Sequence, residues 1–463
     1  MGKQEMTFYS RTLEILYACA GRLTPYNAWS IVKEIRKGES LSLEELEAIQ
    51  WKKITSLISF AYDNVPLYRD LLKNKGLHPA DIRERSDFLK LPVVDKETLN
   101  SHPAEKKIAR GIARDSIVPV YSSGTTGKPL QVFVDSECYN HQYANLLYGY
   151  YLTGWRLGRR IMTVRNFSHG DYEGKYSSSA LNHEPFPLIR KLVYLLVHRK
   201  RFLRPLLDGM ATEEHLLEDV LKEIKRFSPF LLEGNSYFWY IFADYLKRKG
   251  EEITSVKAVE TDEVTLSSSQ REKISKTFNC RVYDNYGSHE LGVVAHECGE
   301  GVGNHILSLS HYVEFLEEGS GKEAKAGEVA RVVVTDLTNR VMPLIRYDTG
   351  DLAIKLNKPC PCGKSYPLMS SIEGRRINSL TLNGRRYTEK FFQEIIYGFD
   401  ETVGFQVNRG KDGGIKVSLL TNAVDLPQKI ERKFSGIMSY PIEVSLVKDI
   451  PLESSGKVRW VKL

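Results

Sequence analysis

A glycine- and hydroxyl-rich loop between two strand-like segments constrains this chain most. The loop reads YSSGTTGKP at residues 121–129, and residues 116–120 and 130–134 flank it. Glycines permit positive φ angles and close backbone approach, so amides and hydroxyls can converge on an anion beside Lys128. Proline follows this lysine, so the loop lacks the magnesium-binding hydroxyl of a Walker motif. The pattern predicts a phosphate-binding hairpin, although its composition alone is also typical of a surface loop.

Strand and helix signals alternate from this hairpin to about residue 335, which predicts an α/β fold with a partly parallel sheet. Ser42 and Glu45 fit a capping box at the start of one expected helix. Helices are expected at residues 41–61, 137–151, 212–227 and 235–249. Later strands are expected at residues 327–337 and 342–356.

The length of 463 residues exceeds what one hydrophobic core usually supports, so at least two domains are expected. We place the boundary after Gly374. This division gives a large N-terminal domain at residues 1–374, with mixed sheets and helices. Residues 375–463 are then expected to form a small α+β C-terminal domain of lid size.

Composition favours a cytoplasmic protein. The chain has six cysteines, too few for a disulfide scaffold, and no apolar run approaches 18 residues. Residues 189–207 are basic and partly apolar, and we interpret them as a core helix with solvated ends rather than as a membrane-surface helix. The net charge of +7 suits nucleotides and nucleic acids alike and does not decide between them, but no nucleic-acid-binding motif is recognisable. Membrane and nucleic-acid partners are therefore not expected, and the oligomeric state is left open.

Two short acidic motifs follow strand signals. Residues 283–290, YDNYGSHE, are expected to form a polar turn in which Tyr286 stacks on a base and Glu290 holds magnesium. In RYDTGD, residues 346–351, Asp351 has the two acceptor oxygens that both ribose hydroxyls need. Each motif taken alone also fits an ordinary turn.

The motifs together resemble those of adenylate-forming enzymes, the acyl-CoA ligase superfamily. SSGTTGKP, YGSHE, RYDTGD, Gly374-Arg375 and SSGK at 454–457 occur in the order and spacing of that family. AYDNVPLYRDLL at 61–72 and CPCG at 360–363 are similar to the phenylacetate-CoA ligase branch, which includes capsule-biosynthesis relatives. The resemblance covers nearly the whole chain.

The resemblance implies a nucleotide site whose residues match the family motifs. Tyr286 and Gly287 would bind adenine, Glu290 would ligate Mg²⁺, Asp351 would bind ribose, and Arg375 would contact the nucleotide. Lys457 would reach the α-phosphate and the acid carboxylate, where a fixed cation stabilises the charge that builds up. The ATP phosphates would be held by the loop residues Ser122, Ser123, Gly124, Thr125, Thr126, Gly127 and Lys128.

The implied activity is ATP-dependent activation of a carboxylic acid to acyl-AMP, followed by transfer to coenzyme A. The chain departs from the family after Arg375, where Arg376, Ile377 and Asn378 replace the usual acidic or lysine hinge residue. Ile377 cannot exchange polar partners between two domain orientations, so an amine or carrier-protein thiol is an alternative acceptor. A more distant alternative is a non-catalytic nucleotide-binding protein.

A zinc site is a further expectation. Cys360 and Cys362 can ligate one ion, and Cys298 with His305 would complete a closed tetrahedral set. Spacing alone also fits reduced cytosolic thiols, and the resemblance favours a structural zinc ion. His296 or Glu297 are alternative fourth ligands.

Overall fold

The computed structural model describes most of the chain, and the described residues divide into two compact units. Described are residues 12–15, 17, 27–122, 129–164, 200–203, 213–382, 385–410, 414–438, 440–451 and 459–462. Among the described residues, the first unit comprises those up to Gly158 together with Asn285–Ser370, and the second unit comprises the remaining described residues. None of the described helices is long and apolar enough to cross a membrane.

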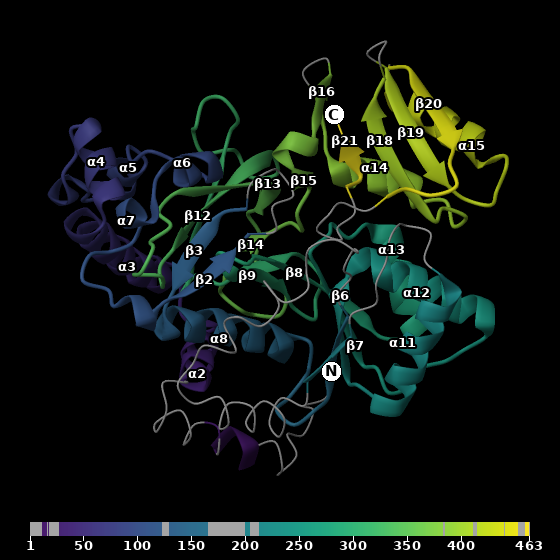
Figure 1. Ribbon diagram of the computed structural model, residues 1–463, viewed down its shortest axis with the longest axis horizontal. Coiled ribbons are helices and arrows are strands. Elements are labelled where there is room, and N and C mark those ends of the chain that lie inside the picture. The colour runs from purple at the N-terminus through teal and green to yellow at the C-terminus, as the bar shows by residue number, and fades with distance from the viewer. Residues whose placement is uncertain are drawn as a thin grey trace. The chain divides into compact units, whose positions relative to one another are not determined.

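Helices make up the N-terminal part of the first unit. Helix α3 (Leu43–Asn64) begins after Ser42, whose hydroxyl accepts a bond from the Glu45 amide while the Glu45 carboxylate bonds the Ser42 amide. The predicted capping box is confirmed. The group α3 to α7 lies together on the left of Figure 1. The other helices are α2 (Ala28–Gly38), α4 (Pro66–Asn74), α5 (Arg85–Phe88), α6 (Lys96–Ser101), α7 (Ala104–Lys107) and α8 (Ser136–Leu152), with single turns η1 (Pro79–Asp81) and η2 (Arg114–Ser116).

A mostly antiparallel sheet forms the centre of the first unit. Its strands lie in the order β11, β12, β13, β14, β10, β9 and the end of β8 (Arg281–Ser288), and β1 adds to β13 in parallel. The hairpin β2 (Val118–Tyr121) and β3 (Gln131–Val134) is separate from this sheet. The remaining strands are β1 (Val94–Asp95), β9 (Gly292–Glu297), β10 (Asn304–Ile306), β11 (His311–Leu316), β12 (Val329–Asp336), β13 (Tyr347–Leu356) and β14 (Leu368–Met369).

A parallel sheet forms one part of the second unit, which confirms the predicted α/β character. Its order is β5 (Lys200–Leu203), β4 (Ile161–Val164), β6 (Leu231–Asn235), β7 (Ala258–Asp262) and the start of β8. Helices α11 (Glu214–Phe227), α12 (Ser236–Lys249) and α13 (Ser268–Phe278) lie beside β6 and β7 (Figure 1). The strand order reverses between β4 and β6, the place where open parallel sheets usually bind ligands.

The C-terminal residues of the second unit share one hydrophobic core with α12. The Tyr240 hydroxyl donates to the Thr402 carbonyl at 2.7 Å, and the rings of Tyr237 and Trp460 lie 5.3 Å apart. The predicted boundary after Gly374 stays a prediction. The elements are β15 (Gly374–Arg375), η4 (Arg376–Asn378), β16 (Leu380–Leu382), β17 (Arg385–Tyr387), α14 (Glu389–Ile396), β18 (Gly404–Arg409), β19 (Ile415–Leu420), α15 (Leu426–Ser435), β20 (Ile442–Leu446) and β21 (Val461–Lys462).

Two strand predictions were wrong at their ends. Residues 283–288 do not form the predicted turn but continue strand β8. The backbone of 283–284 pairs with β7, and the backbone of 285–288 pairs with β9. Strand β13 begins at Tyr347 rather than at 342, because Arg346 has a φ of 50°, which interrupts an extended backbone.

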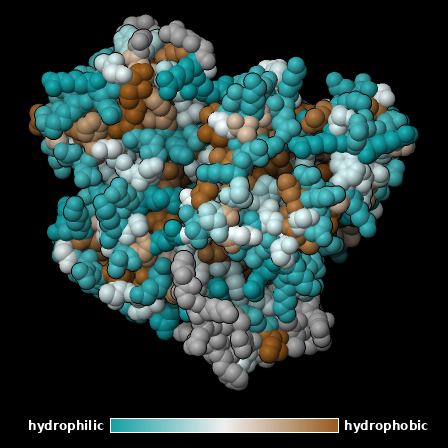
Figure 2. All heavy atoms as spheres, turned by 180° about the vertical axis from the view of Figure 1, so that it is seen from behind, coloured by the Kyte–Doolittle hydropathy of each residue, from teal (hydrophilic) through white to brown (hydrophobic). Residues whose placement is uncertain are grey.

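The surface is mainly polar on the face drawn in Figure 2. Hydrophilic residues dominate this face, and apolar residues form small scattered groups. Among the described residues, well-exposed large apolar side chains such as Val424 and Ile377 are distributed along the chain. Isolated apolar residues of this kind are normal on protein surfaces.

Candidate nucleotide and metal sites

The β2–β3 hairpin presents the ends of the glycine-rich loop as predicted. The Ser122 amide donates to the Leu130 carbonyl at 2.9 Å, and the Ser122 hydroxyl accepts from the Leu130 amide at 2.8 Å. His289 bonds through Nδ1 to the Tyr121 carbonyl at 2.9 Å, which links the hairpin to the turn after β8. Ser123, Gly124, Thr125, Thr126, Gly127 and Lys128 lie outside the described residues, so their predicted roles stay predictions.

Tyr286 and Gly287 lie at the end of β8, where the pairing with β9 shifts register. A Cβ atom on Gly287 would lie 2.4 Å from the Gly292 carbonyl oxygen, so this close approach requires glycine. Tyr286 is 6% exposed, and its hydroxyl lies 3.0 Å from Asp351 Oδ2 and 3.3 Å from Thr349 Oγ1. The predicted adenine and ribose residues are therefore neighbours.

Glu290 lies in the turn between β8 and β9 and is 7% exposed. The Tyr347 hydroxyl, at the start of β13, donates to Glu290 Oε1 at 3.2 Å. Asp351 lies four residues further along the same strand and is also 7% exposed. We call Tyr286, Glu290, Tyr347 and Asp351 the carboxylate edge. A tyrosine hydroxyl bonds one oxygen of each carboxylate, so each acid is oriented by the protein itself.

Buried polar groups lie behind the turn that carries Glu290. His311 Nε2 bonds the Leu291 carbonyl at 3.0 Å, and its register partner on β12 is Asp336. Burial lowers the pKa of His311, and it lowers the pKa of His141 on α8 to about 4. Both imidazoles are therefore neutral near pH 7. A neutral imidazole carries a single N–H, and the Leu291 carbonyl can only accept a hydrogen bond. The proton of His311 therefore lies on Nε2, which faces that carbonyl.

The remaining nucleotide-site predictions are not tested by this geometry. Arg375 lies in β15 of the second unit, and Lys457 lies outside the described residues. Ile377, in the η4 turn that follows Arg375, is 55% exposed. The predicted roles of Arg375 and Lys457 stay predictions.

Four predicted metal ligands lie together in the first unit, and we call them the cysteine cluster. The ligand atoms of Cys298, His305, Cys360 and Cys362 all lie within 4.8 Å of one another. Cys298 Sγ is 3.5 Å from Cys360 Sγ, and Cys362 Sγ is 3.4 Å from His305 Nε2. Three of the four residues are buried. Three thiols and one imidazole are a donor set typical of a closed tetrahedral zinc site.

The tautomer of His305 fits metal binding. Its Nδ1 lies 3.3 Å from the Tyr366 carbonyl, to which only an N–H can donate, so Nε2 keeps a free lone pair facing Cys362. Burial lowers the pKa of His305 to about 4, so the ring is neutral. His296 and Glu297, the alternative ligands, are not part of the group of ligand atoms found in the described chain.

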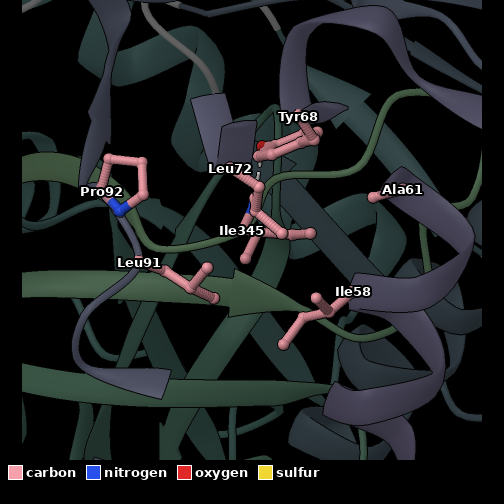
Figure 3. Close-up of a pocket in the computed structure, with 7 residues that line it drawn as sticks. All are labelled: Ile58, Ala61, Tyr68, Leu72, Leu91, Pro92 and Ile345. Atoms are coloured by element: carbon pink, nitrogen blue, oxygen red, sulfur yellow. Dashed lines mark hydrogen bonds between the residues drawn. The ribbon is translucent and has the colours of Figure 1, made fainter. Parts of the chain in front are cut away.

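An apolar cavity in the first unit is too small for a substrate. Its volume is about 10 Å³, close to the minimum for one water molecule. Figure 3 shows side chains from α3, α4 and the segment before β13 pointing into it. The lining residues are Ile58, Ala61, Tyr68, Leu72, Leu91, Pro92 and Ile345. We interpret it as a packing defect of the core.

Sequence reasoning missed the residues that support the carboxylate edge. Tyr347 stands inside RYDTGD, so the motif itself was the available signal. His311 and Glu314 carried no signal, because their partners lie far away in the sequence: His311 bonds the Leu291 carbonyl, and the Glu314 carboxylate accepts from Arg346, just before β13.

Sequence comparison gives relatives over most of the chain. It is 26% identical over 400 residues to the phenylacetate-coenzyme A ligase of Thermus thermophilus, covering 84% of each chain. It is 24% identical over 440 residues to the enzyme of that name from Escherichia coli, covering 91% of this chain and 93% of the relative. Protein CapK of Staphylococcus aureus is 21% identical over 320 residues, covering 68% and 64%. No family model matches the chain.

Solved structures share the fold. A 2-hydroxyisobutyryl-CoA ligase in the postadenylation state matches with a TM-score of 0.74 and 16% identity, covering 92% of this chain and 91% of its own. ATP-bound MatB from Rhodopseudomonas palustris matches with a TM-score of 0.53 and 15% identity, covering 76% and 68%.

Proposed function

Because the chain belongs to the phenylacetate-CoA ligase-like branch of the adenylate-forming superfamily, we propose that it activates a carboxylic acid with ATP and transfers the acyl group to coenzyme A. The observation that carries this proposal is the carboxylate edge. Glu290 and Asp351 come from separate motifs, yet both bond to tyrosines of the same edge. Two of the relatives named above are phenylacetate-coenzyme A ligases, which supports this proposal.

The first step joins the acid to the nucleotide. The acid carboxylate oxygen attacks the α-phosphorus of ATP, the bond to the β-phosphate bridging oxygen breaks, and pyrophosphate leaves. In the second step the coenzyme A sulfur attacks the acyl carbon, its proton is released, and AMP leaves. Binding the reactants in line supplies much of the catalysis, because the protein forms no covalent intermediate.

We assign roles to the chain's own residues on this basis. Asp351 accepts hydrogen bonds from the ribose hydroxyls, and Tyr286 packs on adenine. Glu290 would hold Mg²⁺, which would neutralise phosphate charge when bound. Arg375 contacts the nucleotide, and Lys457 stabilises the charge at the α-phosphate and the acid. The loop at 122–128, including Thr126, holds the departing pyrophosphate.

Pyrophosphate exchange tests the activation step. Radiolabelled pyrophosphate should enter ATP when one of a panel of aryl, fatty and amino acids, phenylacetate included, is present. Absence of exchange with every acid would contradict the proposal. Acyl transfer is then followed with coenzyme A and with amines as acceptors. The exposed Ile377 at the hinge position motivates the amine arm, and transfer only to amines would replace coenzyme A.

A substitution separates the loop from acid recognition. Lys128→Ala should raise KM for ATP by about 10-fold or more, because a charge on the phosphates is lost, while the order of preferred acids stays the same. Initial rates for ATP and for two acids measure this. A changed order of acids would show that Lys128 acts on the acid instead.

We also propose that the cysteine cluster holds one structural Zn²⁺. The close donor atoms and the free Nε2 of His305 support it. Elemental analysis of protein prepared without added metal should find about one zinc per chain, and only trace zinc would contradict it. A cytoplasmic location stays a prediction from the few cysteines.

A further inference from the structure

Arg346 adopts a backbone conformation that side chains rarely occupy. It has a φ of 50°, in the left-handed region, and it directly precedes Tyr347 and strand β13. Such a residue persists only where its surroundings hold it, and this occurs most often at functional sites. The strained residue is the last one before the carboxylate edge.

The Arg346 side chain is almost completely enclosed. Its Nε and Nη2 donate to both oxygens of Glu314, at 2.9–3.2 Å, and the two side chains are 3% and 2% exposed. Its Nη1 donates to the Leu89 carbonyl at 2.8 Å and also to the Leu91 carbonyl. This use of the guanidinium fork depends on its planar geometry, which lysine cannot reproduce.

The backbone around Arg346 is held as tightly as its side chain. Its amide donates to Thr335 Oγ1 at 2.9 Å, and its carbonyl accepts from the Val94 amide at 2.9 Å. The Tyr68 hydroxyl donates to the Pro343 carbonyl at 2.8 Å and accepts from the Ile345 amide at 2.9 Å. Figure 3 shows Tyr68 turned toward Ile345. Segments distant in sequence therefore all fix the start of β13.

Resting on the proposed function, we propose that Arg346 and Glu314 form a positioning pair that fixes Tyr347 and Asp351 for the nucleotide and its magnesium ion. Neither residue of the pair touches the nucleotide. They act through the start of β13, which determines where the Tyr347 hydroxyl meets Glu290 and where Asp351 meets Tyr286. We assign the pair to the nucleotide alone, so acid binding should be insensitive to it.

Arg346→Lys tests the pair while keeping a buried charge opposite Glu314. MgATP affinity, measured by titration without turnover, should fall by about 10-fold or more, the size typical of lost supporting contacts around a site. KM for the acid should change less than about 2-fold. The matched control is Arg85→Lys, whose exposed pair with Glu323 spans 3.1 Å and should leave both quantities unchanged.

A double variant separates positioning from folding. Arg346→Met with Glu314→Leu removes both buried charges, which usually preserves stability, so its unfolding temperature should stay near that of the wild type. Its MgATP affinity should stay low. Recovery of MgATP affinity together with stability would overturn the proposal, as would an equal change for MgATP and acid in Arg346→Lys.

The wild-type titration separates failure of the pair from failure of the function. If the wild type binds no MgATP, the proposed function fails. If the wild type binds MgATP and Arg346→Lys binds it equally well, only the positioning pair fails.

Discussion

The carboxylate edge and the cysteine cluster both gather polar side chains in the first unit, but different contacts hold them. At the edge, Glu290 and Asp351 each bond a tyrosine hydroxyl at 3.2 Å and 3.0 Å. In the cluster, the closest contacts all involve sulfur, which hydrogen-bonds weakly: Cys362 Sγ lies 3.4 Å from His305 Nε2, and Cys298 Sγ lies 3.5 Å from Cys360 Sγ. Hydrogen bonds within the protein therefore orient the edge, whereas the proposed zinc ion would stabilise the cluster.

Glu290→Gln should produce the largest effect and should affect the edge alone. The amide keeps an acceptor for Tyr347 but loses the charge that Mg²⁺ needs, so pyrophosphate exchange should fall by about 1,000-fold. Zinc content and unfolding temperature should not change.

Exchange rates against magnesium concentration measure the Glu290→Gln effect. Glu328→Gln, an exposed carboxylate, is the control. Loss of activity that simply follows a lower unfolding temperature would remove the distinction between the two regions.

Cys360→Ser should affect the cluster alone. Loss of one thiolate should release the zinc ion and lower the free energy of unfolding by about 3 kcal/mol, because metal-binding energy contributes to folding. A chelator should lower the stability of the wild type similarly and leave the variant unchanged. Cys280→Ser, a free cysteine outside the cluster, should keep the zinc. A variant that still binds zinc would reopen the question of which residues are ligands.

Lowering the pH should reduce the free energy of unfolding through His141, one of the polar groups behind the carboxylate edge. Burial lowers the pKa of His141 from its ordinary value to about 4, so its contribution to stability is present above the ordinary histidine pKa of about 6.5 and is lost as pH falls toward 4. The full shift corresponds to about 3 kcal/mol, and partial exposure reduces this to about 2 kcal/mol. Between about pH 6.5 and 4, His141→Gln should therefore lose about 2 kcal/mol less free energy of unfolding than the wild type loses.

Denaturant unfolding of zinc-free protein at several pH values measures this loss. Removing zinc first matters because the cluster ligands also take up protons in acid. The control His215→Gln changes an exposed histidine and should behave as the wild type. If the free energy of unfolding depended on pH identically in His141→Gln and the wild type, His141 would not titrate as its burial implies.

Tyr347→Phe should produce the smallest effect. Removing the hydroxyl that orients Glu290 should raise the magnesium concentration needed for half-maximal pyrophosphate exchange by about 10-fold, with little change in the free energy of unfolding. Tyr312→Phe is the matched control, because the Tyr312 hydroxyl is buried without a partner among the described residues. Unchanged magnesium dependence in Tyr347→Phe would mean that the edge is oriented by other contacts.

The sequence predicted the fold class better than it predicted the local structure of the motifs. The resemblance implied one site for Tyr286, Glu290 and Asp351; the structure brings Tyr286 into contact with Asp351 and pairs Glu290 with Tyr347, which belongs to the same motif as Asp351. The polar residues of 283–288 predicted a turn. They form a strand because they pair with neighbouring strands β7 and β9, and local propensity contains no information about such pairing. The support from Arg346 could not be predicted, because Glu314 lies 32 residues and Leu89 lies 257 residues away.

Cysteine spacing predicted the cluster residues, and the structure places all four together. Spacing could not predict the tautomer of His305, because the Tyr366 carbonyl that fixes it lies 61 residues away. The roles of Lys128, Arg375 and Lys457 stay predictions, and the substitutions above address the rest of the site.

The aromatic contact of Trp460 gives the protein an internal optical reporter. Trp460 is fully buried, 4.9 Å from the Phe405 ring and 5.3 Å from Tyr237 of α12. It stands three residues after Lys457, the residue assigned to the reacting carboxylate. Any reaction state in which the C-terminal segment separates from α12 would expose this indole to water and shift its fluorescence to longer wavelength. A variant that keeps Trp460 as its sole tryptophan would therefore report such a separation if it accompanies either half-reaction.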